Sequence, residues 1–131
     1  MPQVKFVDRT FNCNKNMPWP YGGLSRDHDN GVTNFHFDDL PPTCWTRGRL
    51  ELLGQMRPGL IQLEIGVQST NPDTLKAIRR KTDIDEIRRI TGAINKGHNV
   101  HQHLDLIAGL PSENLECFRH SFNQVYSMDA G

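Results

Sequence analysis

The pattern of apolar and polar positions predicts alternating strands and helices in the second half of the chain. Residues 60–69 (LIQLEIGVQS) and residues 99–109 (NVHQHLDLIAG) have the apolar density of strands. Residues 71–81 and 82–97 lie between them and predict two helices, and residues 115–128 predict a third. The chain thus passes repeatedly from strand to helix.

Residues at the ends of these helices support the assignment. Asn71 is placed to cap the first helix, with Pro72 at its first position. Asp83 and Glu86 have the spacing of a capping box, and Gly97 ends the second helix. We expect apolar stripes to face inward, on Ile84, Ile87, Ile90 and Ile94 in the second helix and on Leu115, Phe118, Phe122 and Val125 in the third.

Two further strands and a short helix are predicted in the first half. The strands are residues 4–8 (VKFVD) and 32–38 (VTNFHFD), and the helix is residues 49–56 (RLELLGQM). Strands that are separated by helical crossovers imply a parallel sheet, because a tight turn cannot connect parallel neighbours. The predicted fold class is therefore α/β, with parallel strands and crossover helices in one domain of residues 1–131.

Two stretches, residues 14–29 and 39–48, break this pattern. Prolines such as Pro20 oppose a helix and paired glycines add entropic cost, so the crossover helix between the first two strands is predicted to be absent. One set of codons that encodes residues 17–25 also encodes AMAIWRFI when it is read from its third base. One set of codons for residues 42–48, read in the same way, encodes DLLDE. We hypothesise that both stretches are frame-shifted translations; the alternative is a genuine proline-rich loop.

Composition narrows the class of partner. Lys and Arg total 15 and Asp and Glu total 15, so the formal net charge is zero and gives no electrostatic case for nucleic acid or an anionic membrane. No apolar run approaches the roughly 18 residues of a membrane span, and the N-terminus lacks the layout of a signal peptide. We therefore expect a cytoplasmic protein. The chain has three cysteines, Cys13, Cys44 and Cys117, which lie far apart in the sequence. An odd number at this spacing favours reduced thiols over disulfides or a zinc site.

Polar side chains gather at the carboxyl ends of the predicted strands, where open sheets and barrels place their sites. These side chains are Asp8 with Arg9, Asp38 with Asp39, Gln68 with Ser69, and His101, His103 and Asp105. The two-residue period of a strand puts His101, His103, Asp105 and Ile107 on one face. With His98, this set could ligate zinc or iron, although surface or hydrogen-bonded histidines are commoner at such spacing.

Three segments together resemble the radical S-adenosylmethionine (SAM) superfamily. They are EIGVQSTNPDTLKAIRRKTD (residues 64–83), HLDLIAGLPSE (residues 103–113) and the following helix with its paired phenylalanines. The chain is most similar to the branch of iron-sulfur oxidoreductases that often carries an upstream cobalamin-binding domain. VKFVDRTFNCN and NFHFD fit the second and third strands of that family's partial (β/α)6 barrel. The resemblance thus implies about strands 2–5 of a TIM-like barrel.

The resemblance also implies a chemistry and a set of site residues. In the family, a [4Fe-4S] cluster reductively cleaves SAM to a 5'-deoxyadenosyl radical that abstracts hydrogen from the substrate, and cobalamin is a further candidate cofactor. The implied cofactor-binding residues are Asp38, Gln68, Ser69, Arg80, Asp105, Ile107 and Gly109. Gln68 and Arg80 would contact the ribose and the methionine carboxylate, Asp105 the ribose hydroxyls. Ile107 and Gly109 would lie against adenine, while Asp8, Arg9 and His103 would face the substrate.

One family feature is missing from this sequence. The cluster motif C-x3-C-x2-C is absent, and the three cysteines cannot substitute for it. We therefore expect an internal fragment of a larger enzyme, inactive alone, whose partners are a small-molecule cofactor and the remainder of the barrel, with neither nucleic acid nor membrane. Two alternatives stay open: a non-catalytic or decayed α/β fragment, and a metal-dependent hydrolase that uses His101, His103 and Asp105.

Overall fold

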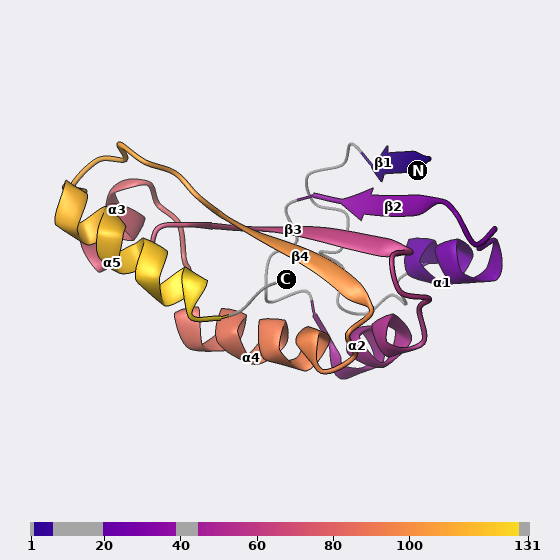
Figure 1. The fold of residues 1–131 in the computed structure, drawn as a ribbon. Coiled ribbons are helices and arrows are strands. Elements are labelled where there is room, and N and C mark those ends of the chain that lie inside the picture. Colours follow the sequence, from indigo (N-terminus) through magenta and orange to yellow (C-terminus); the bar gives the residue numbers. More distant parts are fainter. Residues whose placement is uncertain (1, 7–19, 39–44, 129–131) are drawn as a thin grey trace.

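The computed structural model of the 131-residue chain describes residues 2–6, 20–38 and 45–128 (Figure 1). Several predicted features lie outside these residues. They are the candidate site residues Asp8 and Arg9, the cysteines Cys13 and Cys44, and residues 14–19 and 39–44 of the two irregular stretches.

Four strands form one parallel sheet in the order β1-β2-β3-β4. The strands are β1 (Gln3–Phe6), β2 (Asn34–Phe37), β3 (Ile61–Gln68) and β4 (Val100–Leu106). The helices are α1 (Pro20–Asp27), α2 (Arg47–Gly54), α3 (Pro72–Ala77), α4 (Ile84–Asn95) and α5 (Leu115–Tyr126). The predicted α/β class with parallel strands and crossover helices is confirmed.

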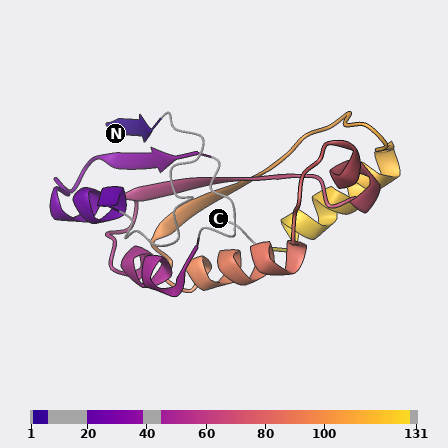
Figure 2. The same cartoon turned by 180° about the vertical axis from the view of Figure 1, so that it is seen from behind.

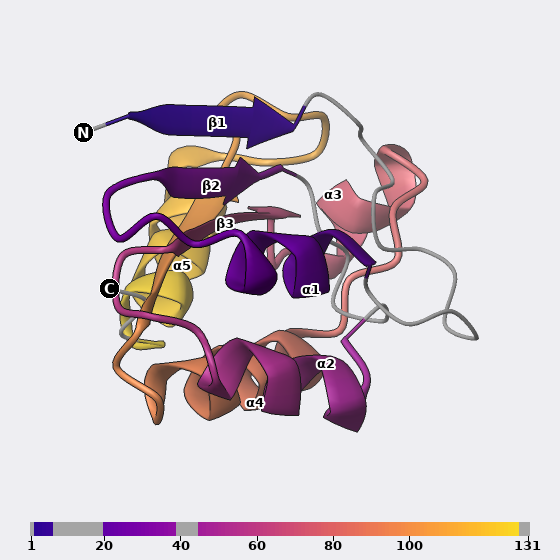
Figure 3. The ribbon, with the colours of Figure 1, turned by 90° about the vertical axis from the view of Figure 1, so that its right-hand side faces the viewer.

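The core lies between one face of the sheet and the helices that cover it. Along β3, buried residues alternate with partly exposed ones, so Ile61, Leu63, Ile65 and Val67 point to the same side. Leu53 of α2 and the isoleucines of α4 pack against this face. Figure 3 shows α1, α2 and α4 on the same side of the strands. The opposite face of the sheet has none of these helices against it.

The second predicted helix matches α4 closely. Ile87, Ile90 and Ile94 are buried. The side chain of Asp83 caps the helix by accepting hydrogen bonds from the backbone N–H groups of residues 85 and 86. The carboxylate of Glu86 also binds the guanidinium of Arg89 at 2.6 Å, one turn further along the helix. The apolar stripe and the Asp83 cap were therefore predictable from sequence.

The first predicted helix is shorter in the structure than in the prediction. Pro72 occupies its first turn as expected, but α3 ends at Ala77. Asn71 stands at the N-cap position without making a side-chain cap. Its amide group donates instead to the hydroxyl of Thr74 at 2.9 Å and to the carbonyl of Ser112 at 3.1 Å. Asn71 therefore connects α3 to the turn before α5 rather than stabilising the helix end.

The predicted absence of a helix within residues 14–29 is wrong for its second half. Residues 20–27 form α1, which begins at Pro20. Proline suits the first position of a helix, because its fixed φ is helical and its missing N–H would have no partner there. The Arg26 side chain donates to Gln55 beside α2 at 2.9 Å, and Ser25 is buried. Tertiary contacts thus offset the cost of the glycines.

The predicted inward face of the last helix is also wrong in part. Leu115 and Phe122 are 80% and 51% exposed, respectively. The side of α5 that faces the protein instead carries Ser121, which is fully buried, together with Val125. The Ser121 hydroxyl accepts a hydrogen bond from the backbone N–H of Thr70 at 3.0 Å. This bond orients α5 so that Leu115, Phe122 and Tyr126 face outward.

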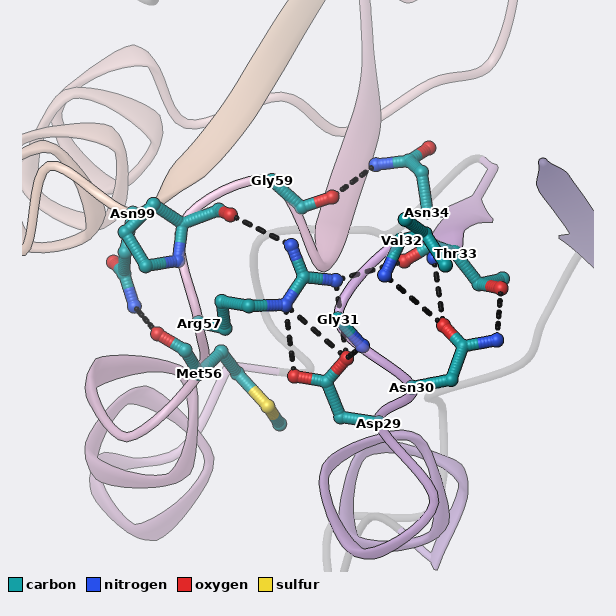
Figure 4. Close-up of polar contacts among 11 residues, drawn as sticks. Asp29, Asn30, Gly31, Val32, Thr33, Asn34, Met56, Arg57, Gly59 and Asn99 are labelled. Atoms are coloured by element: carbon teal, nitrogen blue, oxygen red, sulfur yellow. Dashed lines mark hydrogen bonds and ion pairs between the residues drawn. The ribbon is translucent and has the colours of Figure 1, made fainter. Parts of the chain in front are cut away.

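The amino-terminal edge of the sheet is held by Arg57, in the turn before β3. Its guanidinium binds both carboxylate oxygens of Asp29 and the carbonyl of Thr33 (Figure 4). The hydrogen bonds from Arg57, and a further one from the N–H of Gly31, keep the pKa of Asp29 below its usual range. The loop that enters β2 is thereby fixed to the turn that enters β3.

Two buried amides complete this edge. Asn34 donates to the carbonyl of Gly59 at 2.9 Å, and Asn99 donates to the carbonyls of Leu53 and Met56 at 2.7 and 2.9 Å. The polar groups at this end therefore pair with each other and with the backbone (Figure 4). In parallel sheets and barrels, such saturation at the amino-terminal end of the strands serves stability, and function belongs to the opposite end. Within the described residues, no helix is long and apolar enough to cross a membrane.

Candidate functional site at the carboxyl ends of the strands

A polar face runs across all four strands on the side away from the helices. Because side chains alternate along a strand, this face receives every second residue. Its members are Lys5 on β1, His36 and Asp38 on and after β2, Gln62 and Glu64 on β3, and His101, His103 and Asp105 on β4. On β4 the three named residues are exposed, whereas Gln102 between them is buried. The predicted grouping of His101, His103 and Asp105 on one face is confirmed.

Four side chains from three strands form a charged cluster on this face. The carboxylate of Asp38 lies 2.9 Å from the ammonium of Lys5 and 3.1 Å from Nε2 of His36. The same Nε2 lies 2.9 Å from the carboxylate of Glu64. The hydrogen bond to Asp38 raises the pKa of Lys5, and the negative charges of Glu64 and Asp105 act in the same direction. Asp38, which was predicted to be a cofactor contact, thus belongs to this cluster.

Gln68, the last residue of β3, combines backbone strain with an unsatisfied acceptor. Its φ is 68°, in the left-handed region that costs a side-chain-bearing residue about 1 kcal/mol or more. The pairing of β3 with β4 is irregular at this point, where Gly66 faces Asp105 and Gln68 faces Leu106. Oε1 of Gln68 is buried without a hydrogen-bond partner among the residues that the structure describes. Strained positions of this kind concentrate at functional sites.

Arg80 and Asp105 lie beside the same end of β3. Arg80 follows α3 and donates from Nη2 to the carbonyl of Gly66 at 2.6 Å. Asp105 is the strand partner of Gly66 on β4, and its side chain is exposed. Gly66 itself contributes no side chain to the polar face. The structure therefore brings together Gln68, Arg80 and Asp105, three of the residues predicted from sequence.

Other predicted residues have different surroundings. Ser69 is fully buried, donates to Glu113 at 2.5 Å and accepts from the N–H of Asn71, so its hydroxyl stabilises the turn into α3. Ile107 is 45% exposed just after β4. Gly109 has a φ of 82°, a conformation that side-chain-bearing residues rarely adopt, at the turn toward α5. Figure 2 shows α3 and α5 next to one another beyond the carboxyl ends of β3 and β4.

The histidines of β4 do not form a metal-binding group with Asp105. The rings of His101 and His103 meet edge to face, with their centroids 4.5 Å apart. Within residues 2–6, 20–38 and 45–128, the group of three potential ligands with mutually close donor atoms is His36, Asp38 and Glu64. The arrangement required for the hydrolase alternative, with His101, His103 and Asp105 as ligands, is therefore not present.

Sequence reasoning missed Lys5, His36 and Glu64 as site residues. The alternation of polar positions in NFHFD and IQLEIG contains the signal, because it places His36 and Glu64 on the same face as Asp105. The register of the sheet supplies the rest: Phe37 pairs with Leu63, so Asp38 follows beside Glu64. Strand register across a long connection cannot be obtained from the local pattern.

The fold and the polar face define a class of architecture. The strands are parallel and follow the order of the chain, with helices on one side of the sheet and charged groups on the other. Part of a (β/α) barrel has this arrangement. The sequence matches no protein-family model, and no curated protein matches it.

Among solved structures, the fold is similar to that of coproporphyrinogen III oxidase (HemN) from Escherichia coli, a protein described as a radical SAM enzyme. The TM-score is 0.68 at 21% sequence identity, over 84% of this chain and 25% of that one. The present chain thus spans about a quarter of the length of that enzyme, and the similarity establishes the barrel-type fold.

Proposed function

We propose that the chain is part of the barrel of a radical SAM enzyme and that the carboxyl ends of β3 and β4 form part of its SAM site. The observation that carries the proposal is the convergence of Gln68, Arg80 and Asp105 around Gly66. The fold similarity to a radical SAM enzyme and the motifs GVQS and DLIAGLP support it.

Each of the three residues has a role suited to its chemistry. The guanidinium of Arg80 would attract the carboxylate of the methionine moiety, and the buried Oε1 of Gln68 would gain a donor from the ligand. Asp105 is exposed and would accept hydrogen bonds from the two ribose hydroxyls. Ile107 offers an apolar contact for adenine, and the turn at Gly109 allows the backbone to approach the ring.

The residues of this chain do not fit an iron-sulfur cluster. Its three cysteines lack the C-x3-C-x2-C spacing, and Cys117, the one within the described residues, is on α5. When bound beside a cluster that another segment holds, SAM supplies the radical that abstracts hydrogen. We therefore propose that this chain contributes the binding of the nucleoside and amino acid parts of SAM, and that a preceding strand of the full enzyme carries the cluster.

Calorimetric titration of the purified chain with SAM tests the binding proposal. Wild type should bind SAM. Asp105→Asn should bind SAM about 10-fold more weakly, because an amide oxygen accepts hydrogen bonds from the ribose hydroxyls less strongly than a carboxylate does. Asp85→Asn, an exposed carboxylate on α4, is the matched control and should bind as wild type does. A folded chain that binds no SAM would favour the alternative of a non-catalytic or decayed α/β fragment.

The coding DNA tests the proposed place of the chain in a larger enzyme. Sequencing through codons 12–50 and several hundred bases upstream should reveal compensating frame shifts and an upstream C-x3-C-x2-C motif. A DNA sequence that encodes the chain as printed, with no such motif upstream, would contradict both the frame-shift hypothesis and the proposed parent enzyme.

A further inference from the structure

The charged cluster on the polar face contains three potential metal ligands with mutually close donor atoms. Nε2 of His36, a carboxylate oxygen of Asp38 and a carboxylate oxygen of Glu64 all lie within 4.8 Å of one another. Ligands at about 2.1 Å from an octahedral ion are about 3 Å apart when adjacent and about 4.2 Å apart when opposite. The distances of 3.1 and 2.9 Å from Nε2 to the two oxygens match adjacent ligands. The two distances from Nε2 are therefore compatible with one ion that contacts all three ligands after adjustment of the carboxylate side chains.

The central atom of this group is buried and unsatisfied. His36 is 6% exposed, and its Nε2 has no hydrogen-bond partner among the described residues. Oδ1 of Asp38 is also buried and has no hydrogen-bond partner in the same part of the chain. The two carboxylate oxygens lie 3.1 and 2.9 Å from Nε2, but neither forms a hydrogen bond with it. A cation bound between these atoms would satisfy Nε2 and Oδ1 of Asp38 together.

The charges around His36 favour a cation. Lys5 binds Oδ2 of Asp38 at 2.9 Å, which leaves Oδ1 directed toward His36. Asp38 contacts Lys5, and the charges of Glu64 and Asp105 also raise the pKa of Lys5. With neutral imidazole, Asp38 and Glu64 outweigh the single charge of Lys5, so the described residues of the cluster carry a net negative charge that favours a cation.

From this geometry we propose that His36, Asp38 and Glu64 form a binding site for a divalent first-row transition metal such as Zn²⁺ or Co²⁺. Three protein ligands leave at least one coordination position, which faces the polar side of the sheet and would take water or an oxygen donor of a substrate. One imidazole with two carboxylates favours a transition ion over Mg²⁺ or Ca²⁺, which prefer oxygen ligands only. The site does not depend on the SAM site proposed above.

The other ring nitrogen of His36 lies near the amide of Gln3. Gln3 on β1 places its amide nitrogen 3.5 Å from Nδ1, and the same nitrogen donates to Asn34 at 3.2 Å. A metal at Nε2 requires the proton on Nδ1. Metal binding at Nε2 would therefore require the Gln3 side chain to turn away from Nδ1, because a rotation of its amide in place would put its oxygen against Oδ1 of Asn34, whose amide nitrogen donates to Gly59.

Titration of the tag-free, EDTA-treated full chain with Co²⁺ tests the site. Visible absorption reports whether Co²⁺ enters a protein site, and competition by Zn²⁺ gives its relative affinity. We expect one equivalent of Co²⁺ to bind, Zn²⁺ to displace it, and a large excess of Mg²⁺ to leave it in place. Absence of binding at one equivalent would overturn the proposal, and the trio would then be an ion-pair network.

Substitutions assign the ligands. Glu64→Gln, at a side chain that is 30% exposed, should keep the fold and weaken Co²⁺ binding about 100-fold, and His36→Gln should do the same. His120→Gln, an exposed histidine on α5, is the matched control and should change nothing. Far-UV circular dichroism checks the fold of each variant. Binding that survives in folded Glu64→Gln but is lost in His101→Gln would overturn the assignment and place the ion on β4.

A SAM titration of the same variants separates this proposal from the previous one. Glu64→Gln should bind SAM as wild type does, whereas Asp105→Asn should bind Co²⁺ with wild-type stoichiometry. Each proposal can therefore fail while the other stands.

Discussion

Arg57 and Asp29 form a bidentate ion pair between segments 28 residues apart, with Nε of Arg57 2.9 Å from Oδ2 and Nη2 3.0 Å from Oδ1. The pair connects the loop after α1 to the turn before β3, so it joins the part of the chain with the least regular sequence to the centre of the sheet. The lowered pKa of Asp29 is the measurable sign of this connection.

Asp29 should make the stability of the protein depend on pH in the acid range. Its pKa is lower in the folded state than the value of about 3.9 expected in the unfolded chain. The unfolded state therefore binds the proton first, and the stabilisation is complete above about pH 4 and is lost as pH falls through the folded pKa. Asp29→Asn should be less stable than wild type at pH 7, and the difference should shrink below about pH 4. Urea midpoints from pH 7 to pH 3 measure it; a difference that does not change with pH would contradict the role of the pair.

Gln68→Gly should separate stability from SAM binding. Glycine adopts the φ of 68° without strain, so the free energy of unfolding should rise by about 1 kcal/mol. The loss of the side-chain amide should at the same time weaken SAM binding. His98→Gly removes a similar strain, at a φ of 49°, away from the carboxyl ends of the strands and should raise stability alone. Equal SAM affinity in wild type and Gln68→Gly would argue against the proposed contact.

Two glycines test the conformation of the first crossover. Gly23 lies inside α1, where an added Cβ meets nothing within 4 Å, so Gly23→Ala should stabilise the protein by about 1 kcal/mol. Gly31 also has free space around it but a φ of 78°, so Gly31→Ala should destabilise the protein by about 1 kcal/mol. Thermal or urea unfolding measures both variants. A destabilised Gly23→Ala would show that residues 20–27 are not helical in solution.

The orientation of α5 can be tested with two truncations to alanine. Leu115 is 80% exposed, so Leu115→Ala should change stability by less than about 0.5 kcal/mol. Ile90 on α4 is 1% exposed, and Ile90→Ala should cost about 2–5 kcal/mol. Urea unfolding compares them. A large loss of stability in Leu115→Ala would show that Leu115 faces inward, as expected from the sequence.

The sequence predicted most elements because their apolar periods match the faces that they bury. The stripe of Ile87, Ile90 and Ile94 is an example in which period, cap and packing agree. The failure at α5 has a specific cause. Phe118 and Val125 belong both to the predicted stripe and to the alternative stripe through Ser121, and the hydrogen bond from Thr70 selects the second. A polar contact between residues 51 apart has no local signal in the sequence.

The positions of some candidate site residues were predictable from sequence, whereas the neighbours of others were not. The strand-end positions of Gln68 and Asp105, and the place of Arg80 in the quoted motif, identified side chains that the structure brings together around Gly66. The proximity of His36 to Glu64 depends on the pairing of β2 with β3, whose strands are separated by 23 residues of connection, from Asp38 to Leu60. Local patterns determine which face a residue occupies, whereas tertiary packing determines its neighbour across the sheet.

The strand order β1-β2-β3-β4 follows the order of the chain. Each strand therefore pairs with the one that was synthesised just before it. A nascent chain leaving the ribosome can form the β1–β2 pair before β3 exists, and each later strand extends the sheet at the same edge. The barrel segment can thus be assembled during translation, without waiting for a distant part of the sequence.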